Sequence, residues 1–541
     1  MLNKTKELKF YLIATLIYIV LYSIIHLGWI DATTSVLSTA LQYRGYTADF
    51  HGLGVMYVVD QLKNIEAGNL SHLFNTHTDY PPLYYLTTAA IHVALGGGFD
   101  FFPLRIIAMF FSSLLLFVTF LYAQKAFSPR AGFFSCVLLS LYPQFYNYFS
   151  AVTPHIFLML LVFLSLFFLQ KSNDLHIPLY SILFGVTSGL SLFIKHEALF
   201  FLAGPWLFII ITRFLSKDKN TLKQLFVTAI PFLILFTVFF IYYIAPFAAN
   251  LVGRSNLSLH PDLIDKGLFH FNSITFYVRN LFNCQLKTVF AILFILALPL
   301  YAKMKNPKKW PLLVYTFTPM VILTLITMKW PEYSMPILPA ISIITVQGIL
   351  CIGQKIRNGF IWAAIVSLCL FGLVRFQRDI NCSCNDYQSN VPYWYACEQT
   401  ITKLFDQLDT RTGKTYVTLI RCGCAWWLPT ELAYRKIITQ RNDIVLSDIM
   451  WSKYVIEQMK AADYVISHHA SKEQDWPTLD NMHHRYWCQR GLVPLFSNVD
   501  FLHVVNARRY FKRIAVIKKV FINTPHYFFV FKNIREAEVE R

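Results

Sequence analysis

The chain has 541 residues, of which 55% are hydrophobic, 17% aromatic and 14% charged, and its formal net charge is +18. Soluble domains carry about 25% charged residues and disordered segments are poor in apolar residues. The composition therefore disfavours a soluble enzyme and excludes a disordered chain. The remaining class is an α-helical protein that crosses the membrane several times. In such a protein the placement of Lys and Arg reports topology before it reports any binding of nucleic acid.

Apolar runs long enough to cross a hydrocarbon core of about 30 Å follow one another along the first two thirds of the chain. These twelve runs are residues 10–28, 81–98, 102–123, 131–149, 154–170, 178–194, 197–215, 225–245, 286–302, 311–328, 333–352 and 359–376. The segments between them differ in charge. The N-terminus and five of the linkers together hold 16 basic and three acidic residues, whereas segment 29–101 holds two basic and six acidic residues.

Basic residues concentrate in cytoplasmic linkers, so the charges predict a cytoplasmic N-terminus and an extracytoplasmic C-terminus. This alternation requires that run 81–98, which starts with two prolines and ends in three glycines, does not cross. We interpret it as a re-entrant or half-buried helix at the outer face, packed against protein. The prediction is eleven transmembrane helices, within a range of eleven to thirteen, in a multi-pass protein of the cell membrane, and specifically of a bacterial inner membrane.

Residues 379–541 follow the last apolar run and are long enough to bury a core of their own. Helical stretches at 394–408 and 450–461 alternate with β-rich stretches at 415–420, 463–468, 515–521 and 526–531. The predicted fold class is an all-α polytopic membrane domain, residues 1–378 with an outer-face loop at 29–101, followed by an extracytoplasmic α/β domain at 379–541.

Six of the ten cysteines fall in this predicted outer domain. They are Cys382, Cys384, Cys397, Cys422, Cys424 and Cys488. An even number of cysteines in an oxidising compartment favours disulfides, whose connectivity the sequence does not determine. The alternative is a metal ion held by the two Cys-x-Cys pairs, although no His stands at zinc-ligand spacing beside them.

A long polar loop follows the first apolar run. Within residues 43–85 it gathers Asp49, His51, Asp60, His72, His77 and Asp79. Loops longer than about 15 residues in compact folds are usually functional or disordered, and this loop is too aromatic to be disordered. The alternative is a solvated connection whose acids and histidines hydrogen-bond locally. A second outer loop, 246–285, either lines the site or merely joins two spans.

Four short motifs follow this pattern in order. Residues 81–85 read PPLYY, and residues 103–105 read PLR at the start of the next run. Residues 189–195 read GLSLFIK, and residues 329–340 read KWPEYSMPILPA. With an Asp near the start of the first outer loop, this order resembles the polyprenyl-phosphate-sugar-dependent glycosyltransferases of the GT-C fold. The most similar branch is family 39, which includes protein O-mannosyltransferases and lipid A aminoarabinose transferases. The resemblance covers about the first 350 residues.

The resemblance implies an integral-membrane glycosyltransferase that moves a sugar from a polyprenyl-phosphate donor to the hydroxyl of a lipid, glycan or protein acceptor, at the outer face and with inversion. Asp49 is then the base that takes the hydroxyl proton. His51 is a helper of Asp49, a metal ligand or a plain loop histidine, so no cofactor is certain and a divalent metal is left open.

The family's second Asp falls where this chain has residues 150–156, a stretch that contains no acid. His155 either occupies that site or is a hydrogen-bonded residue at the interface.

The leaving phosphate requires cations near the outer face. Lys195 and Lys329 are the first candidates, and the alternative for both is a lysine that snorkels to the membrane surface. Arg105 either grips the phosphate with two hydrogen bonds or pairs with Asp49 or Asp79. The remaining candidates for substrate binding are His51, Asp79, Glu197, Glu332 and Tyr333. For Glu197 the alternative is that it balances the charge of Lys195.

Two other classes of function are weighed against this hypothesis. A transport or non-catalytic polytopic protein is disfavoured, because transporters place ionisable residues deep in their spans and these runs contain almost no acids. A polymerase or ligase of lipid-linked oligosaccharides uses a long late loop between spans, whereas the large polar segment here is C-terminal. No nucleic-acid partner is expected.

Overall fold

The structure is a computed structural model of the chain. It describes residues 2–31, 81–97, 102–216, 220–241, 271–326 and 331–355, five single positions between 54 and 62, and the backbone of five strands beyond residue 414. The chain divides into two compact units, the first holding the described helices and the second holding the strands.

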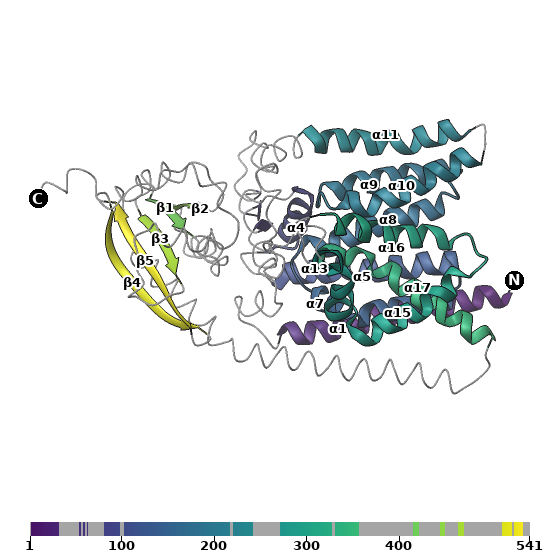
Figure 1. Cartoon of the computed structure of the whole chain (residues 1–541), viewed down its shortest axis with the longest axis horizontal. Coiled ribbons are helices and arrows are strands. Elements are labelled where there is room, and N and C mark those ends of the chain that lie inside the picture. Colours follow the sequence, from purple (N-terminus) through teal and green to yellow (C-terminus); the bar gives the residue numbers. More distant parts are fainter. Residues whose placement is uncertain are drawn as a thin grey trace, which may run out of the picture. The chain divides into compact units, whose positions relative to one another are not determined.

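The first unit is a bundle of apolar helices, most of which run along one direction in Figure 1. The helices are α1 (Leu2–Asp31), α4 (Leu83–Ala94), α5 (Phe102–Ala126), α6 (Pro129–Leu141), α7 (Pro143–Tyr148), α8 (Pro154–Lys171), α9 (Pro178–Leu192), α10 (Ala198–Leu215), α11 (Thr221–Phe239), α13 (Phe271–Ile274), α14 (Phe276–Asn280), α15 (Lys287–Ala302), α16 (Lys309–Thr324) and α17 (Leu338–Lys355). Helices α6, α7, α8 and α9 each begin with proline. Proline is well tolerated there because the first helical N–H has no partner within the helix.

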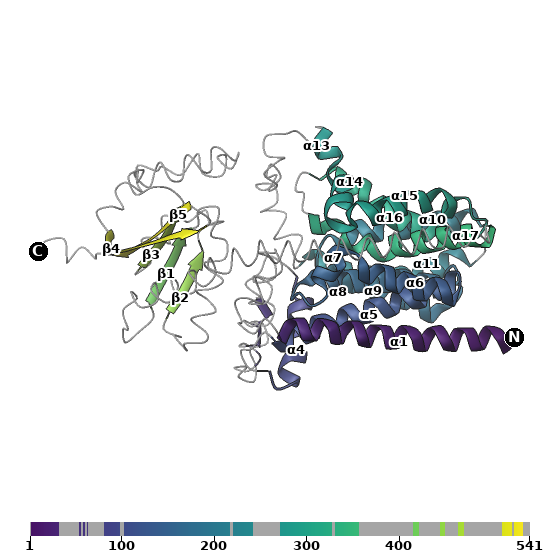
Figure 2. The ribbon, with the colours of Figure 1, turned by 90° about the horizontal axis from the view of Figure 1, so that it is seen from below.

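The two ends of the bundle carry different residues. Figures 1 and 2 place the N-terminus at one end and α4, α7 and α13 at the other. At the N-terminal end, Arg130 Nε lies 3.3 Å from Glu7 Oε1, and Lys308 Nζ donates over 3.2 Å to the carbonyl of Lys125. Three of the basic segments identified in the sequence therefore meet at this end, which we name the basic end. The opposite end, with α4 and α7, is named the distal end.

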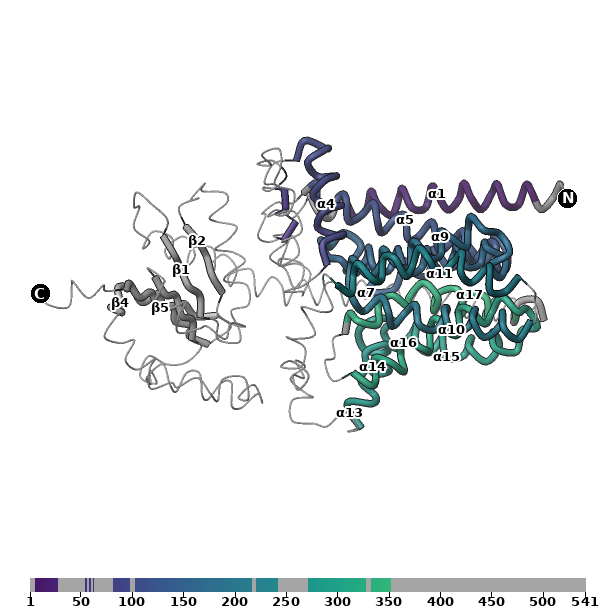
Figure 3. The backbone as a smooth tube through the Cα atoms, turned by 90° about the horizontal axis from the view of Figure 1, so that it is seen from above, coloured from purple at the N-terminus to yellow at the C-terminus, as the bar shows by residue number. Residues whose placement is uncertain are grey.

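Helix α4 lies at the distal end, as Figure 3 also shows. Its 12 residues span about 18 Å, which is too short for a hydrocarbon core of about 30 Å. The N–H of Leu83 donates over 2.9 Å to the carbonyl of Phe193, so the start of α4 is tied to the turn between α9 and α10. The expectation that run 81–98 does not cross therefore agrees with the structure.

Six described helices are long and apolar enough to cross a membrane, or seven if one bent pair counts as a single span. Each apolar run predicted up to residue 352 coincides with helical structure. However, α6 and α9 have only 13 and 15 residues. The structure thus confirms an all-α polytopic bundle, whereas the described residues support fewer than the predicted eleven crossings. Proline explains part of the difference, because run 131–149 is divided at Pro143. Run 359–376 lies outside the described residues.

Small residues allow the closest helix contacts. A Cβ atom added at Gly185 of α9 would lie 2.1 Å from the carbonyl oxygen of Thr228 on α11, and one at Gly189 would lie 2.6 Å from Leu235. These glycines are four residues apart and share one face of α9. A Cβ atom at Gly204 of α10 would likewise collide with α16. Helices α9 and α10 are therefore each fixed against a neighbour, which in turn fixes the turn between them.

A sharp break lies at the distal end. The π-helical turn η4 (Leu281–Gln285) continues α14, and α15 leaves it at an angle of 119°. Lys287, the first residue of α15, has φ +58°, a left-handed conformation that residues other than glycine rarely adopt. The 3₁₀ helix η5 (Pro331–Ile337) precedes α17 and contacts α8, α14 and α16. The break and η5 are both segments that regular helix propensity does not predict.

The second unit contains a five-stranded sheet in the order β2-β1-β3-β5-β4. The strands are β1 (Thr415–Ile420), β2 (Ile444–Asp448), β3 (Tyr464–His469), β4 (Phe511–Phe521) and β5 (Thr524–Asn533). The pairs β1–β2 and β1–β3 are parallel, and β3–β5 and β4–β5 are antiparallel, with an irregularity between Arg513 and Ala515.

Strands β1, β3, β4 and β5 overlap the four stretches predicted to be β-rich, whereas β2 was not predicted. The predicted helices 394–408 and 450–461 and all six cysteines of this region lie outside the described residues. The α/β class, the extracytoplasmic location and the disulfides therefore stay predictions.

Candidate active site

One turn and the start of one helix bring polar side chains together at the distal end. Helix α9 ends at Leu192, and residues 193–197 lead into α10. The N–H of Lys195 donates over 3.3 Å to the carbonyl of Ser191, and the N–H of Ala198 donates over 3.1 Å to the carbonyl of Lys195, so the turn is held by its own backbone. Helix α8, which is buried on most sides, presents His155 in its first turn.

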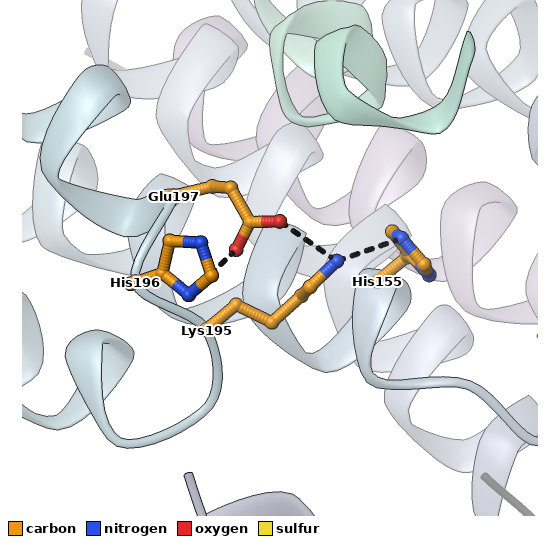
Figure 4. Close-up of polar contacts among 4 residues, drawn as sticks. All are labelled: His155, Lys195, His196 and Glu197. Carbon is orange, nitrogen blue, oxygen red and sulfur yellow. Dashed lines mark hydrogen bonds and ion pairs between the residues drawn. The ribbon is translucent and has the colours of Figure 1, made fainter. Parts of the chain in front are cut away.

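The side chain of Lys195 lies between an acid and an imidazole, as Figure 4 shows. Its Nζ is 3.0 Å from Glu197 Oε1 and 3.2 Å from His155 Nε2. The other carboxylate oxygen of Glu197 is 3.8 Å from His196 Nδ1. Lys195, Glu197 and His155 are 1%, 2% and 2% exposed, whereas the side chain of His196 is 38% exposed. Three of the four groups are thus enclosed by protein, and the fourth reaches the surface.

This geometry does not fit a lysine that snorkels to the interface, because the ammonium is inside the protein. An ammonium only donates hydrogen bonds, so Lys195 donates to Nε2 of His155, and a neutral His155 carries its hydrogen on Nδ1. The Lys195 side chain is also 5.1 Å from the centroid of the Tyr333 ring, within the range of a cation–π contact.

The 3₁₀ helix η5 supplies the remaining members of the cluster. Tyr333 contributes the ring beside Lys195, and Glu332, which is 8% exposed, interacts electrostatically with both Lys195 and Glu197. We name Lys195, Glu197, His155, Glu332 and Tyr333 the distal cluster. It joins residues from α8, from the α9–α10 turn and from η5.

Glu197 is held in its charged form. Burial by itself raises the pKa of this carboxyl group, but the charges of His196 and Lys195 and a hydrogen bond from Lys195 together outweigh burial and hold the pKa below its ordinary value. The Lys195–Glu197 pair is therefore ionised inside the protein. Buried charges in membrane proteins are rare and mark function more often than folding.

Arg105 is 4% exposed and stands in the first turn of α5, which begins at the distal end (Figure 2). The described residues therefore include Arg105, Lys195, Glu197, Glu332 and Tyr333 among the predicted site residues, and they bring the last four together. The other predicted site residues lie outside the described residues and stay predictions: Asp49, His51, Asp79 and Lys329.

Several polar residues of the site were not predicted from sequence. His196 was not among the predicted site residues, although it stands between Lys195 and Glu197. Gln285 Nε2 donates over 2.7 Å to Ser334 Oγ, one residue after Tyr333, and nothing in the sequence joins these two segments. The only feature of the sequence that marks Gln285 is its place as a polar residue directly before an apolar run.

A segment of the chain matches a known protein family. Residues 79–243 match the family model described as dolichyl-phosphate-mannose-protein mannosyltransferase. This segment runs from before α4 to beyond α11, and it includes Arg105, His155, Lys195 and Glu197. No curated protein matches the chain by sequence.

Solved structures share the fold at low sequence identity. ArnT from Cupriavidus metallidurans in the apo state is 12% identical with a TM-score of 0.53, over 96% of this chain and 98% of that chain. The same protein bound to undecaprenyl phosphate is 12% identical with a TM-score of 0.51, over 94% and 98%.

The archaeal oligosaccharyltransferase AglB from Archaeoglobus fulgidus, in complex with an inhibitory peptide and a dolichol-phosphate, is 12% identical with a TM-score of 0.50, over 85% of this chain and 69% of that chain. The shared fold agrees with the order of the motifs seen in the sequence, and the family match covers α8 and the α9–α10 turn of the distal cluster but not η5. Residues 79–243 are thus similar to the family described as dolichyl-phosphate-mannose-protein mannosyltransferase, and the chain shares the polytopic membrane fold of ArnT and AglB.

Proposed function

We propose that this glycosyltransferase moves a sugar from a polyprenyl phosphate to an acceptor hydroxyl at the membrane face on the distal end, and that this face is extracytoplasmic. The carrier class follows from the comparisons. The matching family is described by dolichyl phosphate, and the two solved proteins were captured with undecaprenyl phosphate and dolichol-phosphate. These carriers share one chemistry, a phosphate on a long prenyl chain, and that is the donor class proposed here.

The observation that carries the proposal is the buried distal cluster. The ammonium of Lys195 is enclosed and held by Glu197 and His155. Burying a charge in a membrane protein costs free energy, and ionisable residues in such positions usually serve a function. A phosphate is the anion that the proposed donor would bring to Lys195. Tyr333 and Glu332 border the same ammonium, so an entering phosphate would exchange contacts within a cluster of polar side chains that is largely buried.

The proposed reaction is a single displacement. The acceptor oxygen attacks the anomeric carbon of the sugar on the face opposite the phosphate, the bond from that carbon to the phosphate oxygen breaks, and the anomeric centre inverts. The hydroxyl proton passes to Asp49, and the electron pair of the broken bond leaves on the phosphate, where Lys195 and Arg105 stabilise the negative charge. Lys329 and Asp79 are further proposed contacts of phosphate and sugar.

The metal question rests on residues near Asp49. Within the described ranges, no group of three or more His, Cys, Asp or Glu residues is arranged to hold a metal ion. A divalent ion would depend on Asp49 and His51, and the steps above assign chemistry only to side chains of the chain. The C-terminal α/β domain, with disulfides among its six cysteines, is proposed to be extracytoplasmic, in a protein of a bacterial inner membrane.

The function is tested with purified protein in detergent micelles, a polyprenyl-phosphate-linked sugar and candidate acceptors. We expect release of polyprenyl phosphate that depends on the acceptor, together with a glycosylated product in the mass spectrum. Cells with and without the protein should differ in lipid-linked sugars and in surface glycans. A purified, folded protein that releases no polyprenyl phosphate with any of the sugars found on carriers in those cells would refute the proposal.

The base is tested by Asp49→Asn, which keeps the size of the side chain and removes its ability to take a proton. We expect a loss of about 10²–10⁴ in transfer rate with normal folding and normal donor binding. The matched control is Asp174→Asn, in the basic-end turn between α8 and α9, which should leave turnover unchanged. Near wild-type turnover by Asp49→Asn would remove Asp49 from the mechanism and leave Asp79 and Asp60 as the next carboxylates to test.

A further inference from the structure

The segment that completes the distal cluster is short and weakly held by its own hydrogen bonds. Helix η5 has seven residues and contains Pro336, and 3₁₀ helices have poorer hydrogen-bond geometry than α-helices. Yet η5 must keep Tyr333 and Glu332 beside Lys195. Its position therefore depends on contacts from neighbouring elements.

Two carboxamides on the broken helix supply such contacts. Gln285 Nε2 donates over 2.7 Å and Asn280 Nδ2 over 3.5 Å to the same atom, Ser334 Oγ. Gln285, Asn280 and Ser334 are 0%, 6% and 1% exposed, so solvent does not replace these bonds. From the other side, the hydroxyl of Tyr315 on α16 donates over 2.8 Å to the carbonyl of Pro336.

The break in the helix is what brings Gln285 to η5. Gln285 is the last residue of the π-helical turn η4, and a π turn shifts the residues after it by about one position, roughly 100° around the helix axis. Directly afterwards the chain turns by 119° with Lys287 in the left-handed region. Non-glycine residues in that region are strained and persist where the surrounding structure fixes them, often at functional sites.

We propose that Gln285, supported by Asn280, is a positioning residue of the transfer reaction. Acting through Ser334, it holds Tyr333 and Glu332 against the Lys195 ammonium. The proposal rests on the function proposed above, since it assigns the distal cluster to the reaction. Gln285 acts on substrate only through η5.

The kinetic test uses Gln285→Met, which keeps the volume and removes the donor. We expect kcat/KM for the polyprenyl-phosphate donor to fall roughly tenfold, the effect of one lost buried hydrogen bond. In a Tyr333→Leu background the same substitution should cost about twofold or less, because coupled residues are not additive. The matched control is Gln170→Met at the basic end of α8, which should leave kcat/KM unchanged. An equal loss with and without Tyr333, or no loss in Gln285→Met, would overturn the proposal.

A second measurement does not depend on turnover. Hydrogen–deuterium exchange of the peptide spanning residues 331–337 should be faster in Gln285→Met than in wild type and unchanged in Gln170→Met. If exchange of this peptide is the same in all three proteins, Gln285 does not position η5 and the proposal fails. If exchange is faster in Gln285→Met than in wild type, as expected, but wild type catalyses no transfer, the proposed function fails while the link between Gln285 and η5 stands.

Discussion

Among the described residues, lysines at the two ends of the bundle differ in environment. Lys308 and Lys309 at the basic end donate to main-chain carbonyls of neighbouring turns, where water competes for the same groups. Lys195 is enclosed, and its partners are the side chains of Glu197 and His155. Removing one member of a buried ion pair costs about 3–5 kcal/mol, because the other charge stays buried and alone.

Lys195→Met should therefore lower the free energy of unfolding by about 3–5 kcal/mol and abolish most donor turnover. The double variant Lys195→Met/Glu197→Gln should recover most of the stability, since no charge of the pair is left, but none of the activity. Chemical unfolding in detergent and donor turnover measure the two effects. Lys309→Met at the basic end is the control. Activity that returns together with stability in the double variant would show that Lys195 only supports folding.

The stability should also depend on pH through Glu197. Its pKa is lowered from the ordinary value of 4.5 in the folded protein, so the unfolded state takes up the proton first as pH falls. The stabilisation is complete above about pH 4.5 and is lost as pH falls through the lower folded pKa. Thermal unfolding should show wild type losing stability in this acid range more steeply than Lys195→Met/Glu197→Gln. Parallel curves for the two proteins would contradict the assignment of the ion pair.

Among the elements, α9 and α11 depend on an approach that only glycine permits. Gly185 and Gly189 face α11 at distances too short for a Cβ atom, as in the close helix contacts that small residues allow in membranes. Nearer the start of α9, Ile182 is an exposed apolar side chain. The contacts of Gly185 and Gly189 thus set the position of the turn that contains Lys195, whereas the exposed position of Ile182 tolerates change.

Gly185→Ala should lower stability by about 1–3 kcal/mol, the usual cost of overpacking, because the new methyl group meets the backbone of α11 rather than a movable side chain. Ile182→Ala, at an exposed position of the same helix, should change stability much less. Unfolding midpoints of both variants in the same detergent test this difference. Equal effects of the two substitutions would show that the close contact between α9 and α11 is not a determinant of stability.

In the whole membrane unit, charge and chemistry are separated along the bundle axis. Basic linkers meet at the basic end, whereas the distal cluster, the broken helix and α4 gather at the other end. Such an asymmetry follows from membrane insertion, which retains short Lys- and Arg-rich segments on the cytoplasmic side. Under the proposed function, the chemistry would then take place at one membrane interface.

This orientation predicts the accessibility of single cysteines. Leu95→Cys, at the end of α4, should react with an impermeant thiol reagent in intact cells, whereas Lys305→Cys, between α15 and α16, should react only after the membrane is permeabilised. Both positions are exposed, and the modified peptides are identified by mass spectrometry. Labelling in the reverse order would mean that the distal end is cytoplasmic.

Hydropathy and charge in the sequence determined the class of this protein. A membrane allows only segments that satisfy their own backbone hydrogen bonds, so apolar runs predict helices, and each run predicted up to residue 352 is helical. The ordered motifs predicted a resemblance to the family whose model matches residues 79–243, and Lys195, Glu197, Glu332 and Tyr333 were already candidates. Proline and short length limited the prediction of spans, because whether a 13- or 15-residue helix such as α6 or α9 crosses depends on its neighbours.

Only the tertiary structure decided which of the candidates meet. Lys195 and His155 are 40 residues apart in sequence, and Gln285 and Ser334 are 49 apart, so no local pattern connects them. Their contacts arise where α8, the α9–α10 turn, η4 and η5 converge. The π turn before Gln285 and the left-handed Lys287 run against local propensity, and they persist because contacts from distant segments outweigh the local cost.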